Sequence, residues 1–284
     1  GSESRISGLD KKLKKQNPEP MENKVANFAE METSLARLDR FNLSRTPNFE
    51  PRRGPNTPTY VAAPNSALMY MPLRSGPEAA VCNWLAELDG KSQDDLRTGF
   101  NQKRLKDWMA SHPGHRSFTV LRHPVVRAHH AFCRHVLSTG NGSYTGLRQT
   151  LRRRYGMPIP EMMPDAGYDR VAHRTAFLAF LTFLKGNLSG QTAIRVDAKW
   201  CSQSQSLEGF GEFTLPDRVI REEDLEIELP QLLAQIGHEG AVELGDSAVD
   251  EPFSLADIYD SEIEAAAQSA YQRDYMMFGF DSWR

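Results

Sequence analysis

The pattern of hydrophobic and polar positions changes near residue 58. Residues 1–57 are polar and are interrupted by five prolines, and helical spacing is present only over Val25–Leu38. A polar, proline-broken segment has too little apolar surface to offset the entropy of ordering its chain. We therefore predict an N-terminal arm or linker over residues 1–57, partly disordered or helical, and one α/β domain over residues 58–284.

Short strand-like runs alternate with segments of helical periodicity in the predicted domain. The runs that predict strands are Ala67–Met71, Phe118–Leu121, Ala193–Val196 and Asp217–Ile220. The segments that predict helices are Val81–Leu88, Pro124–Leu137, 169–185, 222–236 and 260–275. Alternating strands and helices favour a mostly parallel sheet with helices on both of its faces.

Composition narrows the class of protein. Apolar residues form 39% of the 284 positions, which is enough for a sizeable core. The sequence contains no run of about 18 apolar residues that would span a bilayer, and no apolar signal-peptide core follows the early lysines. We therefore expect a soluble, cytoplasmic protein with no membrane partner.

The three cysteines are Cys82, Cys133 and Cys201. Their odd number and wide spacing match neither a disulfide framework nor a CxxC metal pair. We expect them to be small core residues, and we expect no metal site.

Charge is distributed unevenly along the chain. The net charge is −3, yet the segment from Lys103 to Arg154 holds eleven Lys/Arg and six His against the single acid Asp107. The segment from Glu208 to Glu264 holds seventeen Asp/Glu against two arginines. A basic middle indicates an anionic ligand, or else the two segments neutralise each other across the fold. We expect no nucleic-acid partner, because the basic stretch lacks interleaved aromatics and a known module.

The loop between the first predicted strand and the first helix, residues 70–78, contains Arg74, Gly76, Pro77 and Glu78. A helix N-terminus attracts phosphate, a nearby cation adds charge, and glycine permits close approach of the backbone. The loop is not a Walker A motif. It could equally be a simple turn, since Pro77 suits the first helical position and Glu78 suits the helix dipole. The Glu78 carboxylate favours that second interpretation, because it would repel a phosphate.

A second cationic turn follows the strand Phe118–Leu121. That strand delivers Arg122 to the carboxyl-terminal edge of the sheet, which is where open α/β sheets bind ligands. The planar guanidinium suits phosphate, because it donates two parallel hydrogen bonds. For Arg127 and Arg134 the simpler interpretation is a solvated helix face, and for His129 it is a buried helix position.

These two segments resemble the phosphosulfate and phosphate sites of sulfotransferases of the carbohydrate and nodulation type. The family has a loop beginning Pro-Lys-x-Gly/Ala-Ser-Thr-Ser, and later Val-Arg-x-Pro-x-x-Arg-Leu-x-Ser-x-Tyr/Phe, which Leu121–Phe132 resembles. Three later segments are similar to further family segments in the same order: Asp197–Gln203, Asp217–Leu225 and Ile258–Phe280. The resemblance spans about residues 66–280, and it implies a P-loop-like sheet that binds 3′-phosphoadenosine 5′-phosphosulfate (PAPS) as the sulfate donor.

The resemblance also implies roles for individual residues. The donor-binding set that it implies is Arg74, Ser75, Gly76, Pro77, Glu78, Arg122 and His130. Arg74 falls on the family's loop lysine, while Arg122 and His130 fall on its 3′-phosphate arginine and serine. Pro77 and Glu78 depart from the family, because they replace the Ser and Thr that donate hydrogen bonds to the 5′-phosphate.

The expected reaction is an in-line attack of an acceptor hydroxyl on sulfur, with adenosine 3′,5′-bisphosphate as the leaving group. Arg74 would stabilise the leaving-group charge, and His112 or His115 would take the proton of the hydroxyl. The related enzymes suggest a carbohydrate acceptor. The alternative is a catalytically impaired relative that binds an anion or a protein partner, and Pro77 and Glu78 favour that alternative.

Overall fold

The computed structural model describes residues 58–245 and 251–284, so the predicted arm over 1–57, with its helix Val25–Leu38, lies outside the described residues. The strands are β1 (Val61–Ala62), β2 (Leu68–Tyr70), β3 (Arg116–Leu121) and β4 (Arg218–Arg221). The helices of eight or more residues are α2 (Glu78–Glu87), α3 (Gln102–Ser111), α4 (Pro124–Ala131), α5 (Thr145–Arg154), α6 (Arg170–Leu188), α7 (Gln203–Phe210), α8 (Leu225–Gln235) and α10 (Ser261–Ala270). Shorter helices are η1 (Gln93–Asp95), η2 (Phe132–Leu137), η3 (Glu222–Asp224), α9 (Leu255–Ile258) and α11 (Gln272–Phe278).

The four strands form one open sheet in the order β1-β2-β3-β4. The strands β2, β3 and β4 are parallel to one another, and β1 pairs with β2 in the antiparallel sense. This confirms the prediction of an α/β fold with a mostly parallel sheet. Within the described ranges, none of the helices combines the length and the apolarity that a bilayer crossing requires.

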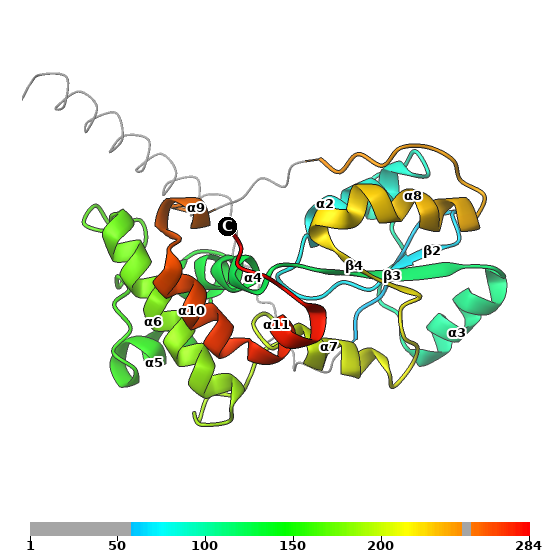
Figure 1. Ribbon diagram of the computed structural model, residues 1–284. Helices are drawn as coiled ribbons and strands as arrows, with labels where there is room; N and C mark the ends of the chain where they lie inside the picture. Colours follow the sequence, from blue (N-terminus) through cyan, green and yellow to red (C-terminus); the bar gives the residue numbers. More distant parts are fainter. Residues whose placement is uncertain (1–57, 246–250) are drawn as a thin grey trace, which may run out of the picture.

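Helices cover both faces of the sheet, as the alternation of strands and helices predicted. Leu68 and Tyr70 point into a core shared with α2 and α8, whereas Met69 and Met71 point into the core on the opposite face. Figure 1 shows α2 and α8 above the sheet, α3 and α7 below it, and a group of helices around α6 and α10 at its side. Successive side chains of a strand face opposite sides, so consecutive apolar residues such as those of β2 require this double cover.

The predicted strand Ala193–Val196 is wrong. Residues 193–196 form bends and irregular backbone after α6. The Asn187 side chain donates a hydrogen bond to the carbonyl of Ile194 at 2.7 Å, which occupies a group that a strand would pair with its neighbour. A short apolar run becomes a strand only where another strand satisfies its backbone.

Three predicted helices are subdivided. The helix predicted over Pro124–Leu137 is α4 followed by η2, a six-residue π-helix. The segment 222–236 begins with the 3₁₀ turn η3 before α8, and the segment 260–275 divides at Tyr271 between α10 and α11. A π-helical turn often marks a functional site, because it re-aims the side chains around it.

Candidate functional site

A pocket of about 710 Å³ opens where the three parallel strands end. The residues that bear on its chemistry are 74–78, Arg122, His130, Arg134, Lys199 and Glu251. Its volume lies within the range of roughly 300–1,000 Å³ that is typical of small-molecule sites. The predicted Arg74 loop and the predicted Arg122 turn therefore share one cavity.

The loop between β2 and α2 holds an unusual serine. Ser75 has a φ angle of 62°, in the left-handed region that non-glycine residues rarely adopt. Its side chain is buried, and its Oγ has no hydrogen-bond partner among the described residues. Of the four such buried side-chain atoms in the described part of the chain, this is the one that lines the pocket. Strain and an unsatisfied buried polar atom together favour a ligand-binding role.

The next residue in the loop, Gly76, has no room for a side chain. A Cβ at this position would stand 2.9 Å from the carbonyl oxygen of Leu73, with which the Gly76 N–H forms a hydrogen bond of 3.1 Å. The tight turn brings the first turn of α2 to the pocket wall, where Pro77 and Glu78 also lie. The N–H groups in the first turn of a helix have no partner within the helix, so this wall favours an anion.

Two carboxylates in the pocket, those of Glu78 and Glu222, disfavour an anion there. Arg74 Nη1 lies 3.5 Å from Glu78 Oε1, and Arg74 Nη2 donates to Thr59 Oγ1 at 3.4 Å. Arg122 donates from Nε and Nη2 to the two carboxylate oxygens of Glu222, both at 2.7 Å. Both arginines of the predicted donor site are therefore paired within the protein.

The pairing of Arg122 with Glu222 follows from the sheet register. Leu121 of β3 lies opposite Arg221 of β4, so the residues that follow them emerge side by side from neighbouring strands. Arg122 also donates from Nη1 to the carbonyl of Ser75 at 3.3 Å, which ties the second cationic turn directly to the first. The convergence predicted from the sequence is present in the structure.

Arg127 has a different place from the solvated helix face that its position suggested. Its side chain is fully buried, and it donates from Nε to the Arg74 carbonyl at 2.7 Å. It also donates to the carbonyls of Ala198 and Cys201. The guanidinium thereby connects the backbone of the Arg74 loop to the segment that precedes α7.

The structure does not bring His112 and His115 together with Arg74. Both histidines lie at the start of β3, packed against Trp108, whereas Arg122 follows the end of that strand. The extended residues of β3 lie between His115 and Arg122, and a rise of about 3.3 Å per residue separates the two by about 23 Å. Neither histidine lines the pocket, so neither is placed to act as its general base. The closeness of these histidines to Arg122 in the sequence was misleading, because the two ends of a strand lie at opposite edges of the sheet.

The pocket offers other proton acceptors. His130, predicted from the resemblance, lines the pocket with a partly exposed side chain, and its Nδ1 lies 4.0 Å from Glu251 Oε1. Glu251, which sequence reasoning missed, also lines the pocket and contacts His129 Nδ1 at 3.1 Å.

A cluster of buried polar side chains lies behind this wall. His129 Nε2 and His173 Nε2 are 2.9 Å apart, and Cys133 Sγ lies 3.6 Å from the first and 3.9 Å from the second. Tyr168 forms a hydrogen bond with His173 Nδ1 at 2.9 Å. Burial, followed by the neighbouring His129, holds the pKa of His173 well below its ordinary value of 6.5, so this imidazole is neutral.

The spacing of this cluster is a signal that sequence reasoning overlooked. His129 and Cys133 are four residues apart, which places them on one helix face, and this spacing differs from the CxxC spacing that the sequence lacks. His173 is forty residues further along the chain and reaches the cluster through α6. The prediction that all three cysteines are buried is confirmed.

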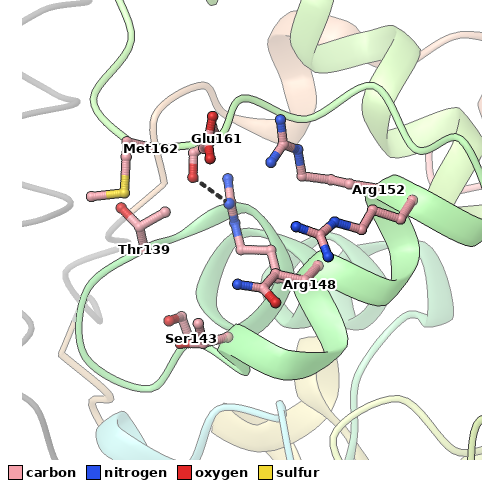
Figure 2. A pocket seen from close by; sticks show the side chains of 9 residues that line it. Thr139, Ser143, Arg148, Arg152, Glu161 and Met162 are labelled. Atoms are coloured by element: carbon pink, nitrogen blue, oxygen red, sulfur yellow. Dashed lines mark hydrogen bonds between the residues drawn. The ribbon is translucent and has the colours of Figure 1, made fainter.

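A second pocket, shown in Figure 2, is smaller, at about 180 Å³. Arg148 and Arg152 of α5 line it, and Arg148 points toward the Glu161 backbone. Arg148 donates to the carbonyls of Leu137, Pro160 and Glu161, and burial lowers its pKa to about 10. The guanidinium holds a loop in place, and the cavity falls below the usual volume of a ligand site.

Comparison of the chain with protein-family models, with curated proteins and with solved structures finds no match in any of the three.

Proposed function

We propose that the protein is a PAPS-dependent sulfotransferase that transfers a sulfuryl group to a hydroxyl acceptor, with a carbohydrate as the expected acceptor. The observation that carries this proposal is Ser75. Its strained backbone holds a buried hydroxyl, which has no partner in the described ranges, on the wall of a pocket that also contains the Arg74 and Arg122 side chains. Two cationic turns at one pocket suit a ligand with two separate phosphate groups.

In the proposed complex, the 5′-phosphosulfate lies at the Arg74–Gly76 loop and the 3′-phosphate lies near Arg122. The Ser75 hydroxyl would donate to a phosphate oxygen, and Arg74 would stabilise the negative charge that develops on the leaving phosphate. Glu251 replaces His112 and His115 as the proposed base, because it shares the pocket with Arg74. The acceptor hydroxyl would lose its proton to this carboxylate as it attacks sulfur.

A second candidate function is anion binding without catalysis. The ion pairs Arg74–Glu78 and Arg122–Glu222 favour it, because a bound phosphate must displace or accommodate two carboxylates. Pro77 favours it as well, since proline offers no N–H to the 5′-phosphate.

Calorimetry with adenosine 3′,5′-bisphosphate and with PAPS tests the proposal. We expect both nucleotides to bind, and we expect Arg122→Ala to weaken binding by roughly 10- to 150-fold, the loss of a charge-assisted hydrogen bond. Ser75→Ala should weaken it about tenfold by removing a neutral donor. Ser261→Ala, at an exposed position of α10 outside the pocket, is the matched control and should bind as the native chain does.

The two candidates differ in a second measurement. Transfer of radioactive sulfate from PAPS to a panel of oligosaccharides supports the enzyme, and tight nucleotide binding without transfer supports the non-catalytic relative. If neither nucleotide binds the native chain, the donor site is refuted.

A further inference from the structure

The geometry points to a metal site for one zinc-like divalent ion, with His129, Cys133 and His173 as ligands. The three ligand atoms, two imidazole Nε2 and one Sγ, all lie within 4.8 Å of one another. All three side chains are buried. They come from α4, the adjoining π-helical turn η2, and α6, so the site would join two helical segments.

The separations are close to those of a tetrahedral site. Metal–nitrogen distances of about 2.0 Å and a metal–sulfur distance of about 2.3 Å place the two nitrogens about 3.3 Å apart and each nitrogen about 3.5 Å from sulfur. The observed distance between the nitrogens is 2.9 Å, and the distances to sulfur are 3.6 and 3.9 Å. Shifts of a few tenths of an ångström would admit the ion without a change of rotamer.

Each histidine has a partner on its other ring nitrogen. Glu251 Oε2 lies 3.1 Å from His129 Nδ1, and the Tyr168 hydroxyl lies 2.9 Å from His173 Nδ1. Metal-binding histidines are oriented in this way, since an acceptor on Nδ1–H fixes the tautomer whose Nε2 lone pair faces the ion. These two partners act as positioning residues.

The donor set selects the class of metal. Two imidazoles and a thiolate suit zinc or another late first-row ion, whereas magnesium and calcium prefer oxygen ligands. A divalent ion, the Cys133 thiolate and the Glu251 carboxylate also sum to zero charge, which lowers the cost of burying them. Three protein ligands leave a fourth position, and His129 lies on the wall of the large pocket, from which water or a ligand group can complete the coordination.

The alternative to a bound metal is a chain of hydrogen bonds through the same side chains. Without a metal, His173 Nε2–H could donate to His129 Nε2, while Tyr168 donates to His173 Nδ1 and His129 Nδ1–H donates to Glu251. That chain satisfies every ring nitrogen. In that chain the two Nε2 atoms nearest to the Cys133 sulfur are already engaged with each other, whereas a metal would bring the sulfur and both Nε2 atoms to one centre.

The test is metal analysis of the full-length protein after dialysis against a weak chelator, followed by titration of the apoprotein with Co²⁺. We expect one equivalent of zinc in the purified protein. We also expect one equivalent of Co²⁺ to produce the thiolate-to-metal charge-transfer band in the near ultraviolet and the intense visible bands of a tetrahedral site. Because this spectrum is measured on the native chain, it does not depend on whether a variant folds.

Variants then assign the ligands. Cys133→Ser should abolish the charge-transfer band, and Cys82→Ser, a buried cysteine outside the cluster, should leave it unchanged. Tyr168→Phe removes one positioning hydroxyl and should weaken Co²⁺ binding by about tenfold while the spectrum keeps its shape. Less than 0.1 equivalent of zinc together with no Co²⁺ spectrum would overturn the site, as would an unchanged spectrum in Cys133→Ser.

Discussion

Arg127 offers the sharpest test of how the candidate site is held together. Its side chain is fully buried and makes no ion pair with a carboxylate among the described residues; it donates instead to three backbone carbonyls. One of these carbonyls belongs to Arg74, and the other two precede α7. Substitution of Arg127 by methionine, which is apolar and unbranched, removes all three hydrogen bonds. It leaves the carbonyls of Arg74 and Cys201 without donors, while the Ala198 carbonyl keeps the Cys201 Sγ–H.

The expected loss of stability follows from those contacts. A hydrogen bond from a charged donor contributes about 1.5–3 kcal/mol, so three of them set an upper limit of about 5–9 kcal/mol. The Arg127→Met variant no longer bears the cost of burying a charge, and this gain in stability offsets part of the stability lost with the hydrogen bonds. We therefore expect the free energy of unfolding to fall by about 3–5 kcal/mol, since each buried carbonyl left without a donor costs about 1–3 kcal/mol.

Urea denaturation followed by circular dichroism measures the change. Arg154→Met is the matched control, because Arg154 is exposed on α5 and its replacement should alter stability by less than about 0.5 kcal/mol. Arg127→Lys should fall between the two, since an ammonium cannot reproduce a planar fork that reaches three acceptors. A loss below about 1 kcal/mol in Arg127→Met would refute the view that this residue fixes the Arg74 loop.

Three further predictions concern charge in and around the pocket. Glu222→Gln should tighten adenosine 3′,5′-bisphosphate binding about tenfold in calorimetry, because a phosphate no longer competes with a carboxylate for Arg122; weaker binding would contradict the proposed 3′-phosphate site. Glu78→Thr should tighten PAPS binding several-fold by removing like charge and restoring a hydroxyl, and unchanged binding would count against the placement of the 5′-phosphosulfate. Burial, followed by Lys199, holds the pKa of His135 well below 6.5, so the unfolded chain binds more protons below that pH and stability falls as the pH drops, by at most about 1.4 kcal/mol per pH unit. Because the pKa of His173 is shifted in the same direction, His135→Gln should reduce this slope between pH 6.5 and 5.5 without abolishing it, and an unaltered slope in urea denaturation would disprove the assignment.

The parallel part of the sheet was predictable from the sequence because its strands are buried on both faces. Ala67–Met71 is a continuous apolar run and Phe118–Leu121 is apolar except for Thr119. The first run exceeds β2 by one residue at each end, and the second ends with β3 and begins two residues after its start. Parallel strands end at one edge, so the meeting of Arg74 and Arg122 followed from the order of strands and helices alone. The prediction of a strand at Ala193–Val196 failed, because a short strand-like run does not reveal whether another strand lies beside it.

The ion pairs and the histidine cluster could not be predicted from local sequence patterns. The pairing of Arg122 with Glu222 depends on a register between β3 and β4 that joins residues one hundred positions apart. The meeting of His129 with His173 depends on how α6 packs against α4, which no local pattern records. Local periodicity predicts which face of an element is buried, but the neighbour that it meets is a property of the whole fold.

The basic and the acidic segments of the chain meet at the pocket. The basic segment contributes Arg122 and His129, and the acidic segment contributes the carboxylates that contact them, Glu222 and Glu251. The two interpretations of the asymmetry are therefore compatible, because the acidic segment neutralises the basic one at the same place where an anion would bind. A phosphate that enters the pocket replaces a carboxylate as the acceptor of the arginine's hydrogen bonds. Its net gain in binding free energy is therefore small relative to the strength of each contact. The carboxylates, more than the arginines, should then set the affinity of this pocket for an anion, and their removal should change that affinity in the direction opposite to the removal of Arg122.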